Sequence, residues 1–168
     1  RPTIYGERNP RLSVPAITGI SLHEDRTEPG FLQDIKLTGQ VNVGEGFRAF
    51  MAGGGVDLNV PGMDVALIDL YLRDDNFNDP TWQTTLVWRA HWDVGTELAF
   101  QGFFDAYGLD DGFEIVTAPQ LVLDAGAPLG LPAGRLYAGT ELHLSYTDID
   151  GLDERTTYLP QLLIFWKL

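Results

Sequence analysis

The feature that most constrains this chain is a strict alternation of apolar and polar residues. It is clearest in residues 82–93 (WQTTLVWRAHWD), where one face carries Trp, Thr, Leu, Trp, Ala and Trp. The other face of the same segment carries Gln, Thr, Val, Arg, His and Asp. A period of two predicts a β-strand, because successive side chains of a strand point to opposite faces. No long segment has the 3.6-residue period of an amphipathic helix.

The apolar face of this segment begins with Trp82 and ends with Trp92. Indole rings are enriched at the two headgroup levels of a membrane, and barrel strands carry aromatic residues at both ends of their lipid face. At ~3.3 Å per residue and ~40° of tilt, the intervening strand spans roughly 25 Å, the height of the apolar band of a barrel. We therefore predict a transmembrane strand with membrane-girdle residues Trp82 and Trp92, and we place Trp166 of the last strand in the same girdle.

The alternation recurs along the chain and predicts an all-β protein with one domain over residues 1–168. Turn residues divide it into about nine strands, near residues 7–14, 31–43, 47–58, 63–73, 81–93, 96–107, 113–124, 135–147 and 158–168. The segment 14–30 is predicted to be a long loop. Pro119 lacks the N–H of the ladder, so its strand is expected to lie at an edge or to carry a bulge. The fold expected is an antiparallel up-and-down transmembrane β-barrel.

Charged residues in the middle of strands separate a membrane barrel from a soluble sheet. Alternation alone is shared by any half-buried antiparallel sheet. Here the polar face is charged in most strands, which suits a wet lumen opposite a lipid face. The predicted lumen-lining residues are Asp69, Tyr71, Arg73, Arg89, His91, Gln101, Phe103, Asp105, Tyr137, Glu141 and His143.

Composition excludes several other functions. The chain has 24 acidic and 11 basic residues, a formal charge of -13, and no cysteine. A negative field without a basic stripe argues against nucleic acid as a partner. The absence of cysteine removes disulfides and thiolate chemistry. The three histidines lie far apart in the sequence and no metal or phosphate motif is present, so no metal and no cofactor are expected.

Several segments together resemble a known family. The chain ends in PQLLIFWKL, similar to the closing strand of bacterial outer-membrane barrels, although the last residue is Leu168 where Phe is usual. The ordered segments NPRLS (9–13), FMAGGGVDLNVPG (50–62), LIDLYLRDD (67–75), FQGFFDAYGL (100–109) and GLDERTTYLPQLLIFWKL (151–168) resemble the Tsx-like, OmpK-type nucleoside-specific channels. The resemblance implies a bacterial outer-membrane passive channel for nucleosides or similar small polar solutes. Its partners would be membrane lipid and lipopolysaccharide.

The family barrel has twelve strands, and its N-terminal third precedes the NPRLS-like piece. An odd count of nine would place the two ends of the chain on opposite sides of the membrane, whereas single-chain bacterial barrels have even counts. Either the segment 7–14 is not a strand, which leaves eight strands, or roughly three earlier strands are absent. The resemblance favours the second alternative. The acidic connections 74–80, 109–112 and 147–157 are expected outside the cell.

Two other functions stay open. His143 and Ser145 share a strand face with Glu141, and outer-membrane lipid A deacylases use a similar H-x-S arrangement. The Asn-Ala-Gly that usually follows that serine is missing, because Tyr146, Thr147 and Asp148 stand there. We therefore assign no catalytic residue. The other alternative is a soluble β-barrel that binds a small ligand. Whether Ser145 faces the lumen or lipid separates channel from enzyme, and dependence on detergent separates both from the soluble barrel.

Overall fold

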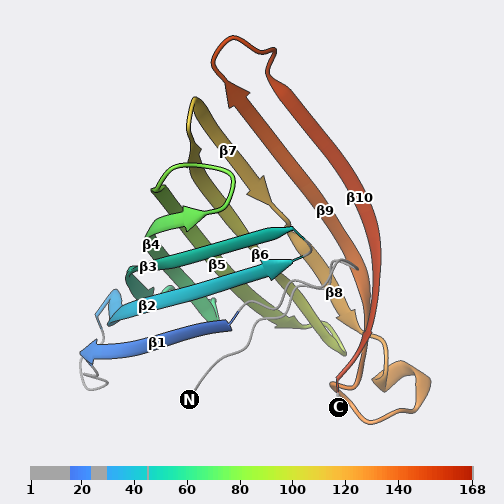
Figure 1. Ribbon diagram of the computed structural model, residues 1–168. Coiled ribbons are helices and arrows are strands. Elements are labelled where there is room, and N and C mark those ends of the chain that lie inside the picture. The colour runs from blue at the N-terminus through green and yellow to red at the C-terminus, as the bar shows by residue number, and fades with distance from the viewer. Residues whose placement is uncertain (1–15, 24–29, 45, 168) are drawn as a thin grey trace.

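The protein is a single antiparallel sheet that the chain builds strand by strand (Figure 1). The computed structural model describes residues 16–23, 30–44 and 46–167. The strands are β1 (Ala16–His23), β2 (Leu32–Gly44), β3 (Phe47–Leu58), β4 (Val65–Asp75), β5 (Thr81–Asp93), β6 (Glu97–Leu109), β7 (Gly112–Thr117), β8 (Gln120–Asp124), β9 (Leu136–Ile149) and β10 (Arg155–Trp166). One 3-10 turn, Ala127–Leu129, precedes β9. The all-β, antiparallel, up-and-down prediction is confirmed.

Strands β7 and β8 are two halves of one strand. Both lie between β6 and β9, and the chain breaks the ladder between them at Ala118 and Pro119. The expectation from Pro119 of an edge or bulged strand is wrong, because the strand lies inside the sheet and keeps its register with β6 and β9 across a short interruption. Gly102 of β6 makes the break possible, because a Cβ there would lie 2.7 Å from the carbonyl oxygen of Ala118. The N–H of Leu142 donates to the Pro119 carbonyl at 3.0 Å and bridges the gap to β9.

The loop predicted for residues 14–30 is wrong where β1 forms. Ala16–His23 pairs with β2, from Ala16 opposite Val41 to His23 opposite Ile35. The segment contains β-branched residues that suit a strand, but Gly19 and its short length weaken the sequence pattern. Pairing with β2 decides the outcome, so tertiary context overrides the local signal. The strand predicted at 7–14 and the terminal Leu168 lie outside the described residues.

The register gives the sheet one polar and one apolar face, and burial on them is the reverse of that in a soluble protein. On the polar face, Asp69, Arg73 and Gln83 are only 5%, 8% and 4% exposed. On the apolar face, Leu72 and Leu162 are 78% and 87% exposed. Charged residues are almost never fully buried unless they are paired, and large exposed apolar surfaces mark a contact with something other than water.

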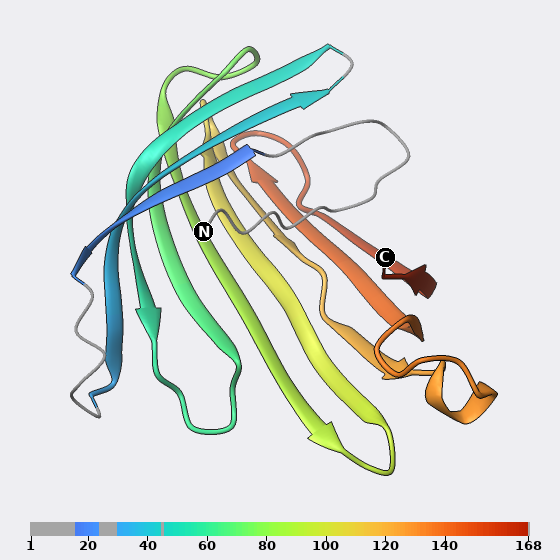
Figure 2. The ribbon, with the colours of Figure 1, turned by 90° about the horizontal axis from the view of Figure 1, so that it is seen from below.

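The polar face is the inner side of a curve. Lys36 and Asp69 belong to β2 and β4, which flank β3, yet their charged groups lie 3.5 Å apart. Strands two places apart are separated by roughly 9.6 Å in a flat sheet. Their side chains therefore meet because the sheet bends toward this face and the intervening strand carries glycine. Figure 2 shows the resulting curved wall from below.

The sheet has two ends with different turns. One end, named here the acidic end, carries the turns 76–80, 110–111 and 150–154, which hold six acidic residues and no basic one. The other end, the C-terminal end, carries the turns 59–64, 94–96 and 125–135. Strands β1 and β10 are the edges of the described sheet. Among the described residues there is no helix of the length and apolarity needed to cross a membrane.

Candidate functional site

The polar face of the sheet is the candidate functional site. The cross-strand pairs put all eleven predicted lumen-lining residues on this face, on four strands: Asp69, Tyr71 and Arg73 (β4), Arg89 and His91 (β5), Gln101, Phe103 and Asp105 (β6), Glu141, His143 and Tyr137 (β9). The predicted girdle residues Trp82, Trp92 and Trp166 lie on the apolar face, each about half exposed. Contacts on the polar face divide it into four clusters.

The first cluster joins β2, β3 and β4 around Lys36. Its Nζ lies 2.6 Å from Asp57 Oδ1 and 3.5 Å from Asp69 Oδ1. Tyr71 Oη donates to Asp69 Oδ2 at 3.0 Å and lies 3.2 Å from the Thr38 hydroxyl. A buried amine held by two carboxylates leaves this cluster with a negative formal charge.

Two glycines of β3 make these contacts possible. A Cβ at Gly55 would lie 2.9 Å from Lys36 Cε and collide with the Asp69 carboxylate, and one at Gly53 would collide with the Leu70 carbonyl. Lys36 and Thr38 are not among the eleven predicted lumen-lining residues, although alternation in residues 34–43 puts both on the polar face. The glycines between the strands indicate the contact. Gly53 and Gly55 pair with Thr38 and Lys36 on one side and with Tyr71 and Asp69 on the other, so all of them lie on the polar face and no side chain separates the two outer pairs.

The second cluster surrounds Arg73. Its Nε donates to Asp75 at 2.9 Å and its Nη1 to Gln83 at 2.9 Å. Gln83 donates in turn to the Thr85 hydroxyl at 3.1 Å, and Thr85 donates to Asp105. The guanidinium also lies 4.0 Å above the Tyr107 ring. This chain of polar contacts links β4, β5 and β6 and fixes the planar cation at the wall.

The third cluster lies near the C-terminal end. Arg89 Nη2 donates to Glu97 at 2.6 Å, and its Nε lies 3.5 Å from Asp64. His91 Nδ1 lies 2.6 Å from the same Asp64 carboxylate. As with Lys36, one base faces two carboxylates. These side chains are about one third to one half exposed, so water screens their interaction.

The fourth cluster crosses β6, β8 and β9. Gln101 donates to Gln120 at 2.9 Å, and Gln120 donates to Glu141. Toward the C-terminal end the polar face becomes apolar: Ala99, Val122 and Tyr137 form a buried group against which Leu163 and Phe165 pack. The Tyr137 ring is stacked on Phe165 with centroids 5.2 Å apart, and Lys167 lies 4.2 Å above it. Tyr137, only 3% exposed, is therefore a packed residue whose ring already has partners.

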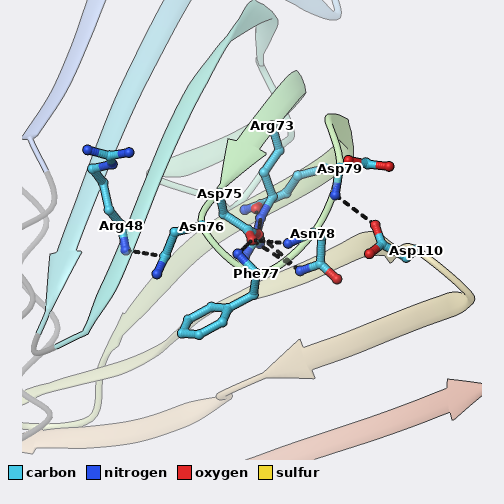
Figure 3. Close-up of polar contacts among 9 residues, drawn as sticks. Arg48, Arg73, Asp75, Asn76, Phe77, Asn78, Asp79 and Asp110 are labelled. Atoms are coloured by element: carbon cyan, nitrogen blue, oxygen red, sulfur yellow. Dashed lines mark hydrogen bonds and ion pairs between the residues drawn. The ribbon is translucent and has the colours of Figure 1, made fainter.

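Two carboxylates at strand ends hold the turns in place. Burial alone would raise the pKa of Asp75, but hydrogen bonds from the Phe77 N–H, Arg73 and Asn78 outweigh it and keep that pKa below its usual range (Figure 3). Asp124 accepts the N–H groups of Gly134 and Gly126 at 2.6 and 2.9 Å. These bonds lower the pKa of the Asp124 carboxyl despite some desolvation.

The apolar face carries no comparable polar network in the described residues. A groove of about 400 Å³ lies on it beside the β7–β8 break, lined by Phe100, Pro119, Leu121, Leu142, Pro160 and Leu162 among others. Trp88 lies over Gly102 next to it and contacts Phe100, with ring centroids 6.0 Å apart. An exposed surface of Leu, Ile, Phe and Trp needs an apolar environment.

No group of three or more His, Cys, Asp or Glu side chains in the described part of the chain is arranged to hold a metal ion. Comparison of the chain with protein-family models, with curated proteins and with solved structures finds no match. The assignment of a function therefore depends on the geometry and chemistry of the sheet itself.

Proposed function

We propose that the protein is a transmembrane β-barrel of the bacterial outer membrane, with its apolar face against lipid and its polar face along a water-filled passage. The observation that carries this proposal is the reversed burial of the two faces. Lipid supplies the apolar environment for Leu72, Leu162 and Ile164, which are at least 78% exposed. Water and paired charges supply the environment for the polar face. A soluble barrel would leave this apolar surface in water.

Within that class we propose a passive channel for nucleosides or similar small polar solutes, without a catalytic step and without a cofactor. The polar face carries donors and acceptors in four clusters on several strands, which suits weak serial binding of such solutes. Nucleosides as the solute rest on the resemblance of the ordered sequence segments to the Tsx-like channels. Membrane lipid and lipopolysaccharide would contact the apolar face, and nucleic acid is not a partner.

The charge balance supports a preference for cations and neutral solutes. Lys36 and Arg89 each face two carboxylates, and Arg73 is linked to Asp75 directly and to Asp105 through Gln83 and Thr85. Glu141, whose carboxylate accepts a hydrogen bond from Gln120, adds a further negative charge. Such a surface attracts cations and repels phosphates. Uncharged nucleosides are therefore expected to pass more readily than nucleotides of the same base.

The position of Ser145 supports a channel over an enzyme that acts on lipid A. Ser145 pairs with Val116 and Thr157 and shares the polar face with Glu141. An enzyme whose substrate is a membrane lipid needs its nucleophile within reach of lipid, whereas Ser145 lies on the face opposite to its neighbours Leu144 and Tyr146. The serine and His143 serve a channel as hydrogen-bonding groups of the wall.

The test is conductance of the full-length protein in planar bilayers. We expect small, cation-preferring currents that millimolar nucleoside partly blocks, with a weaker block by the matching nucleotide. Asp105→Asn combined with Glu141→Gln is expected to weaken the cation preference, whereas Glu154→Gln in the 150–154 turn, the matched control, leaves it unchanged. A protein that never conducts, or a current that nucleosides leave unchanged, would contradict the nucleoside channel. Hydrolysis of lipid A would then be the next assay.

A further inference from the structure

The turn 76–80 at the acidic end is fixed to both of its neighbouring turns (Figure 3). Asn76 donates to the Gly46 carbonyl at 2.9 Å and accepts from the Arg48 N–H at 2.8 Å, which ties it to the β2–β3 connection. At its other end, the Asp79 N–H donates to Asp110 at 2.7 Å, which ties it to the β6–β7 turn. The turn thus reaches along the rim from β3 to β6.

A carboxylate sets the conformation inside the turn. Asp75 Oδ1 accepts the N–H groups of Phe77 and Asn78, both at 2.9 Å, while its Oδ2 accepts Arg73 Nε. The carboxylate therefore joins the turn to the second cluster of the polar face. With its backbone held in this way, the turn presents Phe77 in one orientation.

Phe77 extends over the polar face. Its ring is parallel to that of Phe47, with centroids 6.1 Å apart and an interplanar angle of 8°. Phe47 pairs with Gly44 at the end of β3 and shares the face of Ala49 and Met51. The guanidinium of Arg73 lies 5.9 Å from the Phe47 ring and 4.0 Å from Tyr107. The rings and the cation form one continuous stack from the turn into the polar face.

From these contacts we infer that Phe77, stacked on Phe47, is a gate residue that sets the size of the solutes admitted at the acidic end. The inference rests on the proposed channel. Phe77 is 67% exposed, and its stacking on Phe47 places the ring on the polar-face side of the sheet. The hydrogen bonds of Asp75, Asn76 and Asp79 keep it there, whereas an unrestrained turn would let the ring swing aside.

The first experiment compares Phe77→Ala with Leu152→Ala in the full-length protein. Leu152 lies in another turn of the same end and is also 67% exposed, but it has no part in the stack. We expect Phe77→Ala to increase the single-channel conductance and to shift the exclusion limit toward larger poly(ethylene glycol) molecules. Leu152→Ala is expected to match the unmodified protein. An unchanged exclusion limit for Phe77→Ala overturns the gate.

The second experiment measures the contact without using conductance. The chain has no cysteine, so Phe47→Cys combined with Phe77→Cys is labelled only at these positions by a short bismaleimide. We expect an intramolecular cross-link, seen as a shift in gel mobility, that reverses the wider exclusion limit of the unlinked variant. Failure to cross-link overturns the stack and with it the gate. Cross-linking of a protein that never conducts contradicts the proposed channel and leaves the contact standing.

Discussion

Asp75 occupies a position where one carboxylate serves both a strand and a turn. It accepts hydrogen bonds from Arg73 on one side and from the Phe77 and Asn78 N–H groups on the other. Only its ionised form accepts all of them without donating a proton. The order of the turn is therefore linked to the charge of this one group.

This linkage predicts a loss of turn structure in acid. The pKa of Asp75 is lowered in the folded protein, so its contribution to stability is complete above the ordinary aspartate value of about 3.9 and is lost as the pH falls through the lower, folded value. Amide resonances of Phe77 and Asn78 should report an apparent pKa below 3.9, and Asp75→Asn should abolish that titration. Arg73 and the acidic Asp74, Asp79 and Asp110 share this rim. An apparent pKa at or above the ordinary value would contradict the linkage.

The glycines of β3 allow a matched comparison. A Cβ at Gly53 would collide with the Leu70 carbonyl, a backbone group that cannot rotate away, whereas a Cβ at Gly54 meets nothing closer than 3.6 Å. We expect Gly53→Ala to lower the free energy of unfolding by about 1–3 kcal/mol. Gly54→Ala, one residue away on the apolar face, should change it by less than about 1 kcal/mol. Chemical unfolding in detergent micelles measures both, and equal effects would argue against the bend at β3.

At the scale of the strand, β4 provides a series of apolar positions on one face. Leu72 pairs with Trp82, a predicted girdle residue, and Ile68 pairs with Leu86, near the middle of β5. In a bilayer, Ile68→Arg should destabilise the protein by about 2–4 kcal/mol and Leu72→Arg by about 0–1 kcal/mol. Leu152→Arg, in a turn, is the control and should have no effect. Folding into lipid vesicles measures the series, and three equal values would contradict a lipid face.

The strands also show what could be predicted from the sequence. Period-two alternation was sufficient to place β5 with its observed bounds, and the glycine-rich segment 47–58 was also predicted with the bounds of β3. Pro119 indicated an irregular strand, but not the interruption inside the sheet that divides β7 from β8. Strand β1 was missed because its short, glycine-containing segment owes its conformation to pairing with β2. Strand β10 begins at Arg155, three residues before the predicted start. Its first three residues, Arg155, Thr156 and Thr157, are polar and show no alternation in the sequence, but they pair with β9.

The face of each site residue follows from parity, but its partners do not. Parity alone put Asp69 and Arg73 on the polar face. The contact of Lys36 with Asp69 needs the register of three strands, the bend of the sheet and the glycine between them, and no local pattern encodes all three. Tyr137 was predicted to line the lumen, but its ring is covered by Phe165, its partner on β10, and by Lys167, two residues further along the chain.

At the scale of the whole molecule, tryptophan fluorescence tests which face meets lipid. The chain has four tryptophans, and the strand registers put Trp82, Trp88, Trp92 and Trp166 on the apolar face. In vesicles we expect brominated lipids to quench most of the emission, and most strongly for Trp88, which lies between the predicted girdle residues Trp82 and Trp92. Aqueous iodide should quench little of it. Strong quenching by iodide with none by brominated lipids would contradict the proposed orientation.

The bare backbone at Gly53 and Gly55 has a mechanical consequence. A sheet bends most easily where no side chains resist the bend. The sheet therefore bends at β3, between β1 and β2 on one side and the strands from β4 onward on the other. In Figure 1, β1, β2 and β3 run at a large angle to β9 and β10, as expected for a sheet that bends in this way. The ion pair of Lys36 with Asp69 and the hydrogen bond of Thr38 with Tyr71 join β2 to β4 across β3 and hold the angle of this bend. A change in the angle of the bend at β3 would therefore move β1 and β2 together. It would alter the width of the curved polar face as a whole, whereas a change in a single turn would not.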